Sequence, residues 1–133
     1  MKEIYLSRLQ EQLNIVGLYY KKISKSWQKT WKLRKQHDEL YEKYIDLCIL
    51  ALLTRRCIEL KITKNINVLV FDNKNEKKYF GLKSISDYFI HQVGGQYSYK
   101  SNKIYLHIYT DKRKEIKIDI VNFIKQIESI IHI

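Results

Sequence analysis

INVLVF, residues 66–71, divides this chain of 133 residues into two kinds of hydrophobic pattern. Before Lys61 the apolar residues recur with the period of an α-helix, and after it they recur with the period of a β-strand. A nearly continuous apolar run of this length predicts a strand that is buried on both faces. A helical first half followed by strands indicates an α+β fold.

The residues that follow this strand predict a small antiparallel sheet. DNKNE, residues 72–76, is typical of a polar turn, so residues 77–80 are expected to return as the partner strand of a hairpin. Residues 96–99 and 104–109 are expected to form a second hairpin around a polar tip. In its second strand two sets of side chains alternate, which predicts opposite faces for them: Ile104, Leu106 and Ile108, and Tyr105, His107 and Tyr109.

Two helices are expected within and after this sheet. Ser84 is expected to cap a short helix over residues 85–93, which Gly94 and Gly95 would end. Alternating isoleucines predict a last strand that leads into a helix from about Asp119. The apolar stripe of that helix is Ile120, Ile124, Ile127 and Ile131. The predicted order is ααββαβββα, with a helical domain over residues 1–60 and a small α+β domain over residues 61–133.

The first half carries a heptad pattern in which eleven of fourteen seam positions are apolar, aromatic or small. The three exceptions, Thr30, Arg34 and His37, are consecutive seam positions. Two structures explain this gap. Either one helix ends near Lys35 and a second begins near Asp38, forming an antiparallel hairpin, or a single helix of about 58 residues dimerises as a coiled coil. We favour the hairpin, because Trp, Tyr and Cys pack poorly in a two-stranded seam.

The segment KKISKSWQKTWKLRK, residues 21–35, carries seven cationic side chains and no acidic one. On a helix at about 100° per residue, six lysines share one arc: Lys21, Lys22, Lys25, Lys29, Lys32 and Lys35. The opposite side of that helix carries an apolar stripe: Leu9, Leu13, Val16, Tyr20, Ile23, Trp27 and Trp31. This pattern predicts that the indoles face protein and that the lysines meet an acidic partner.

The formal net charge of +11 is large for this length and suggests a polyanionic partner. No signal peptide is evident at the N-terminus, and the longest apolar run is too short to span a bilayer. Cys48 and Cys57 would lie on opposite faces of a helix, beyond the reach of a disulfide. We therefore expect an intracellular protein, cytoplasmic or nuclear, that is neither secreted nor bound to a membrane.

The sequence contains no recognisable catalytic motif. It has no glycine-rich phosphate loop, no CxxC and no HExxH, and no defensible nucleophile with a spaced His and acid. Asp72 and Glu76 could serve a metal-assisted nuclease, but a turn explains them as well. We therefore expect no enzymatic activity, no metal and no cofactor.

Two segments resemble parts of DNA-binding endonucleases. VLVFDNKNEKKYFGLKSISDYF, residues 68–89, resembles the strand, turn, strand and helix modules with which some intron-encoded endonucleases bind DNA. GGQYSYKSNKIYLHIYTDKRKEI, residues 94–116, is similar to the sheet of LAGLIDADG-type homing endonucleases, although the acidic metal-binding motif of that family has no counterpart here. The resemblance implies contact with nucleic acid.

The function expected from the sequence is therefore non-enzymatic binding of DNA or RNA. Phosphate contacts from the six lysines of residues 21–35 would give low sequence specificity. The alternative is a structural subunit of a larger protein assembly, built on coiled-coil-like helices. A homodimer or another protein partner is expected at the apolar stripe through Leu13, Tyr20, Trp27 and Trp31.

Overall fold

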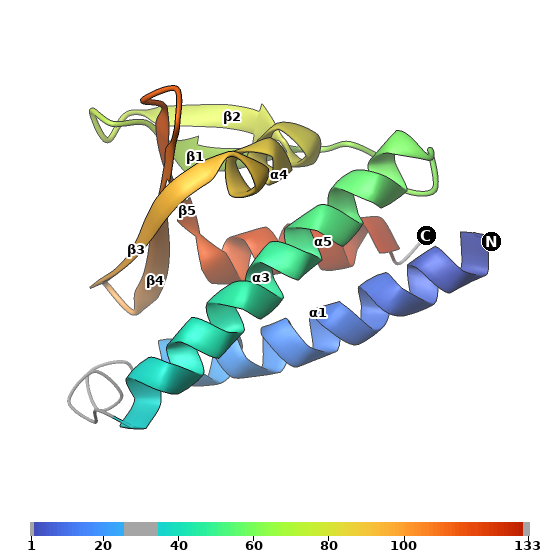
Figure 1. The fold of residues 1–133 in the computed structure, drawn as a ribbon, viewed down its shortest axis with the longest axis horizontal. Helices are drawn as coiled ribbons and strands as arrows, with labels where there is room; N and C mark the ends of the chain where they lie inside the picture. Colours follow the sequence, from blue (N-terminus) through green and yellow to red (C-terminus); the bar gives the residue numbers. More distant parts are fainter. Residues whose placement is uncertain (1, 26–34, 132–133) are drawn as a thin grey trace.

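The computed structural model describes residues 2–25 and 35–131, which form four helices and a five-stranded sheet. The predicted α+β class and the order ααββαβββα are confirmed (Figure 1). The elements are α1 (Lys2–Ser24), α3 (Lys35–Glu59), β1 (Asn67–Phe71), β2 (Lys77–Gly81), α4 (Leu82–Ile90), β3 (Gln92–Lys100), β4 (Lys103–Thr110), β5 (Glu115–Asp119) and α5 (Ile120–Ile131).

The first two helices run in opposite directions and pack against each other (Figure 1). The side chain of Gln12 on α1 donates a hydrogen bond of 2.7 Å to the carbonyl of Asp46 on α3. Helix α1 ends at Ser24, whose hydroxyl donates to the carbonyl of Lys21. The hairpin is therefore correct and the single long helix is wrong, because the apolar stripe of α1 is buried within its own chain.

The five strands form one antiparallel sheet in the order β2-β1-β5-β4-β3. The helices cover one of its faces (Figure 1). That covered face carries small and branched apolar side chains, all buried: Val68, Val70, Ile104, Leu106, Ile108, Ile116 and Ile118. The alternation predicted for β4 is confirmed, since its aromatic residues and His107 are only half-buried on the other face.

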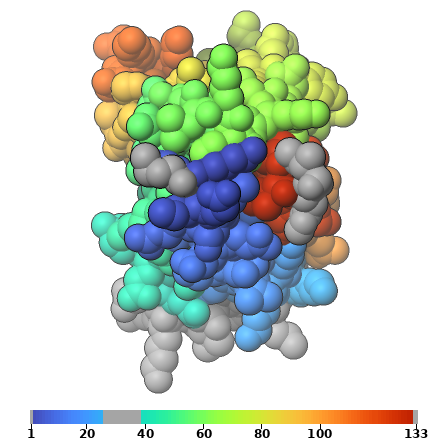
Figure 2. All heavy atoms as spheres, turned by 90° about the vertical axis from the view of Figure 1, so that its right-hand side faces the viewer, coloured from blue at the N-terminus to red at the C-terminus, as the bar shows by residue number. Residues whose placement is uncertain are grey.

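One hydrophobic core joins the helical hairpin to the sheet. Leu9, Val16 and Tyr20 of α1 belong to it, as do Phe123 and Ile127 of α5. In the space-filling view α1 adjoins α5, and the start of α1 lies on the same side of the molecule as the end of α5 (Figures 1 and 2). No described helix is both long enough and apolar enough to cross a membrane.

Three local predictions are wrong, one on strand β1 and two on the start and the end of helix α4. Strand β1 is buried on one face only, because Leu69 and Phe71 lie on the side that no helix covers and stay half-buried. Helix α4 begins at Leu82, directly after β2, so Ser84 lies within the helix and is not its N-cap. A residue remote in sequence bonds to the first turn instead: the side-chain oxygen of Asn65 accepts the backbone N–H of Lys83 at 3.1 Å.

The two glycines expected to end that helix lie inside β3. Gly95 faces α3, and a Cβ placed there would lie 2.5 Å from the hydroxyl oxygen of Tyr44, whereas one at Gly94 would meet nothing within 4 Å. Gly95 therefore allows α3 to approach the edge strand closely, which is a packing role and not a helix cap.

Candidate nucleic-acid interface

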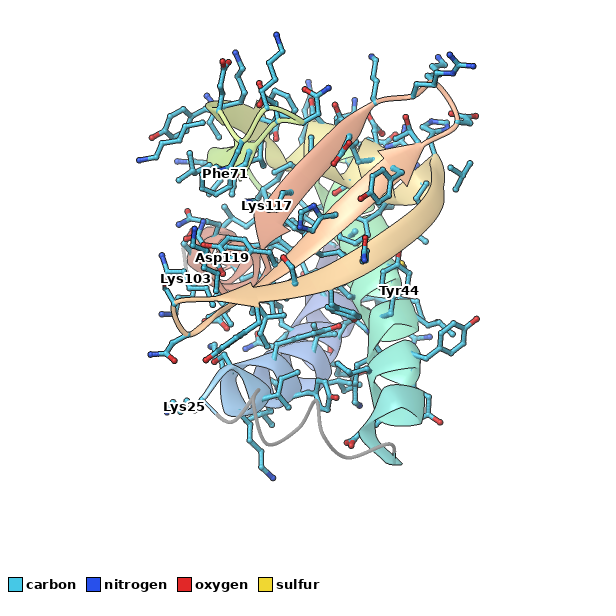
Figure 3. The ribbon with its side chains drawn as sticks, turned by 90° about the vertical axis from the view of Figure 1, so that its left-hand side faces the viewer. Lys25, Tyr44, Phe71, Lys103, Lys117 and Asp119 are labelled. Atoms are coloured by element: carbon cyan, nitrogen blue, oxygen red, sulfur yellow. The ribbon has the colours of Figure 1, made fainter. Side chains whose placement is uncertain are left out.

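The side of the sheet without helices, here called the open face, combines aromatic and cationic side chains. Cross-strand register assigns the members, because residues paired across antiparallel strands point to the same face. The open face carries Leu69 and Phe71 of β1, Lys77 and Tyr79 of β2, Glu115, Lys117 and Asp119 of β5, Lys103, Tyr105, His107 and Tyr109 of β4, and Gln96, Ser98 and Lys100 of β3. In Figure 3 these strands lie in front of α1 and α3.

Lys117 is the centre of this face (Figure 3). Its ammonium nitrogen lies 4.8 Å from the ring centroid of Phe71 and 5.0 Å from that of Tyr105. The two rings meet edge to face, with centroids 6.1 Å apart. The ammonium also donates a hydrogen bond of 2.5 Å to the side-chain oxygen of Asn75 in the β1–β2 turn. A cation on β5 is thus held between the aromatic rings of the two strands that flank it, β1 and β4.

His107 extends this arrangement toward the edge of the sheet. It is paired with Lys117 on β5, and its Nε2 lies 3.0 Å from the hydroxyl of Ser98 on β3. Burial lowers the pKa of His107, the charge of Lys117 lowers it further, and Glu115 partly opposes both effects. The neutral imidazole is therefore favoured beside the lysine.

The charge of the open face is positive. Its members include four lysines and only two carboxylates: Lys77, Lys100, Lys103 and Lys117, and Glu115 and Asp119. The exposed turn between β4 and β5 adds three cations and one carboxylate at the ends of two of these strands: Lys112, Arg113 and Lys114, and Asp111. An anionic polymer lying along the sheet would meet cations at its centre and near its ends.

A hollow of about 320 Å³ opens where β1, β2 and β4 meet the start of α5. Its apolar lining includes Leu69 and the aromatic residues Phe71, Tyr79 and Tyr105. Its polar lining includes Asp119, Asn122 and Gln126. Asp119 caps α5, because its Oδ1 accepts the backbone N–H of Asn122 at 3.2 Å. Rings and hydrogen-bonding groups therefore converge on one recess of the open face.

The six lysines predicted as one arc do not lie on one helix. Lys21 and Lys22 belong to α1, Lys25 follows the end of that helix, and Lys35 begins α3. Lys29 and Lys32 lie outside the described residues. The single projection is therefore wrong, because α1 ends at Ser24 and the chain reverses before α3.

These lysines also differ in their surroundings. The ammonium of Lys21 is paired with Glu128 of α5 at 2.6 Å, so it is engaged within the chain. Lys25 is exposed, and the end of α1 lies on the side of the molecule to which the β3–β4 hairpin points (Figures 1 and 3). Lys25 is therefore one described member of the predicted set that can extend the positive charge of the open face.

The apolar stripe predicted for a partner is largely internal. Leu13 and Tyr20 are 5% and 0% exposed, because they pack between α1 and the rest of the chain. Neither is available to a second protein. Trp27 and Trp31 lie outside the described residues, so their prediction stays a prediction.

Part of the open face can be predicted from the sequence. Alternation alone predicts the tyrosine and histidine side of β4. It does not predict the partners Phe71 and Lys117, because strand register joins segments that are remote in the chain.

Asp72, considered above as a metal ligand, has a structural role in the β1–β2 turn: its Oδ1 accepts the backbone N–H groups of Lys74 and Glu76 at 2.9 and 2.8 Å. Within residues 2–25 and 35–131, no three His, Cys, Asp or Glu residues are grouped so as to hold a metal.

Comparison of the chain with protein-family models, with curated proteins and with solved structures gives no match.

Proposed function

We propose that this protein binds single-stranded nucleic acid on the open face of its sheet and catalyses no reaction. The proposal rests on the placement of Lys117 between the rings of Phe71 and Tyr105. The same face also holds three further lysines: Lys77, Lys100 and Lys103. Proteins that bind single strands combine these elements, because aromatic rings stack on bases while lysines neutralise phosphates.

The shape of the site favours a single strand over a duplex. Phe71 and Tyr105 are half-buried within the sheet, so only a base that has left its own helix could stack on them. Tyr79, at 68% exposed, offers a third ring at the β2 edge. A duplex presents its phosphates but keeps its bases stacked, so it would gain the cationic contacts without the aromatic ones.

Lys117 would change its partner when the strand arrives. In the free protein its ammonium donates to the neutral amide oxygen of Asn75. A phosphate oxygen is charged and accepts a stronger hydrogen bond than an amide does. The flexible side chain of a lysine can move toward a phosphate and leave the ring faces of Phe71 and Tyr105 to a base.

Fluorescence anisotropy with labelled single-stranded and duplex oligonucleotides of equal length tests the proposal. We expect tighter binding of the single strand, and a loss of about 5- to 150-fold for Phe71→Ala or Tyr105→Ala, because each stacked base contributes about 1–3 kcal/mol. Tyr41→Ala is the matched control, since Tyr41 is 68% exposed and lies on α3, so it is not a member of the open face. Equal losses in all three variants, or no binding by the wild type, would refute the proposal.

A second candidate function is that of a structural subunit in a protein assembly. It is favoured by apolar side chains exposed on the hairpin: Ile15 and Leu18 of α1, and Ile45, Ile49 and Leu52 of α3. The three on α3 recur at the spacing of one helix face. Sedimentation velocity separates the two functions: a concentration-dependent assembly that Ile49→Glu abolishes, and that oligonucleotides leave unchanged, supports the second.

A further inference from the structure

We propose that the hollow beside α5 receives one unstacked base of the bound strand and selects guanine at that position. This inference rests on the proposed function, and it adds a base-reading site to a face whose other contacts carry little sequence information. Three features of the hollow lead to it: its size, the separation of its apolar and polar walls, and the carboxylate of Asp119.

The size and walls of the hollow suit a flat ligand with a polar edge. Its volume of about 320 Å³ is at the lower end of the range for small-molecule sites. Phe71, Tyr79 and Tyr105 provide aromatic surface on the sheet side, whereas Asn122 and Gln126 present amides from the first turns of α5. A base could therefore stack on a ring while its hydrogen-bonding edge meets the helix.

Asp119 is an unusual residue for a surface that binds a polyanion, because its charge repels phosphates. Its Oδ1 accepts one hydrogen bond within the chain, from the backbone of Asn122. A carboxylate offers about four lone-pair positions, so acceptor capacity remains for a ligand. In Figure 3 Asp119 lies on the same part of the open face as Lys103 and Phe71, which places a carboxylate, a cation and a ring around one recess.

The chemistry of the four bases decides which one fits a carboxylate. Guanine presents two adjacent donors, N1–H and N2–H₂, and a carboxylate can accept both at once. Adenine and cytosine place a ring nitrogen acceptor beside their amino group, and that acceptor would face an anionic oxygen. Uracil and thymine have one N–H between two carbonyls. The side-chain amide of Asn122 can donate to O6 of guanine, since its carbonyl already accepts from Gln126 at 3.5 Å.

The decisive variant is Asp119→Asn. Asn caps helix N-termini about as well as Asp, so α5 keeps its cap while the hollow loses its carboxylate. Asp72→Asn is the matched control, because Asp72 also accepts backbone N–H groups through one carboxylate oxygen but lies in the β1–β2 turn. Thermal unfolding of both variants checks that each remains folded.

The experiment measures the affinity of the full chain for four uridine-rich oligonucleotides that differ only in one central base, at one salt concentration. We expect the guanine oligonucleotide to bind about ten-fold more tightly than the others. Asp119→Asn should bring guanine to within about two-fold of uracil, and Asp72→Asn should keep the preference. Inosine lacks the N2 amino group of guanosine. Replacing the central guanine by inosine should therefore remove most of the ten-fold preference in the wild type and should not change the affinity of Asp119→Asn.

Three results would overturn the inference, and they differ in what else they overturn. If the wild type binds all four oligonucleotides equally while Phe71→Ala still weakens binding, the base-reading hollow is wrong and the open face stands. If the wild type binds none of them, both the inference and the proposed function are wrong. A guanine preference that survives Asp119→Asn would also refute the role given to the carboxylate.

Discussion

The hydroxyl oxygens of Tyr20 and Tyr97 lie 2.6 Å apart and join α1 to β3. Burial raises the pKa of both phenols far above the ordinary value, so both are neutral at physiological pH. The Tyr97 oxygen also lies 3.4 Å from the carbonyl of Leu40, to which it donates. Tyr20 therefore donates to Tyr97, and a short chain of hydrogen bonds ties α1, β3 and α3 together.

Removing the two hydroxyls should have unequal effects. Tyr97→Phe leaves the fully buried donor of Tyr20 without an acceptor, which costs about 1–3 kcal/mol, whereas Tyr20→Phe leaves Tyr97 bonded to Leu40 and costs about 1 kcal/mol. The double variant should be more stable than the sum of the single effects implies. Urea unfolding of the three variants measures this, and strictly additive losses would contradict the hydrogen-bonded chain.

The paired glycines of β3 offer a second test of how α3 meets the sheet. Gly95→Ala places a methyl group against the rigid ring of Tyr44, so we expect a loss of about 1–3 kcal/mol in the free energy of unfolding. Gly94→Ala is the control one residue away and should change it little, because its Cβ meets nothing within 4 Å. Tyr44→Phe combined with Gly95→Ala should recover part of the loss. If Gly95→Ala left the free energy of unfolding unchanged, the close approach of α3 to β3 would be contradicted.

The salt dependence of binding should follow the lysines of the open face. A single strand that engages four lysines gives a slope of about −2.8 for log K against log salt, so a fourfold rise in salt weakens binding about fifty-fold. Lys103→Gln should make the slope shallower by about 0.7. Lys64→Gln, an exposed lysine that precedes β1, serves as the control and should leave the slope unchanged. Identical slopes in the two variants would exclude Lys103 from the interface.

His107 predicts a pH dependence of stability. Its pKa in the folded chain lies below the ordinary 6.5, so the unfolded chain binds the proton more readily between those two values. The contribution of His107 to the free energy of unfolding is therefore complete above about pH 6.5 and is lost as the pH falls through the folded pKa. His107→Gln should unfold with a flatter pH profile between about pH 7.5 and pH 5. Parallel profiles for the two proteins would show that the histidine is not perturbed.

Local periodicity explains why so much of the fold could be predicted from the sequence. The alternation of β4 and the stripe of α5 both follow from spacing within one element, and the burial of Leu106, Ile108, Ile124 and Ile127 confirms them. The order of helices and strands follows in the same way. The same spacing predicts that Tyr105 and His107 share one face, and this prediction requires no partner strand.

Relationships between remote segments account for what the sequence did not predict. The lysines of residues 21–35 fit a helical projection, but the projection cannot show that α1 ends at Ser24 or that Lys21 pairs with Glu128. The open face depends on Phe71 pairing with Lys117, which is a matter of strand order. The most concentrated positive charge therefore lies in residues 21–35, whereas the rings and cations of the open face meet on the sheet.

The most direct test of the account is an NMR titration of the ¹⁵N-labelled protein with a single-stranded oligouridine of about twelve nucleotides. If the open face is the binding surface, the largest changes in amide chemical shift should occur in β1, β4 and β5, around Phe71, Tyr105 and Lys117. Changes confined to the end of α1 and the start of α3, or no change at saturating oligonucleotide, would contradict the account.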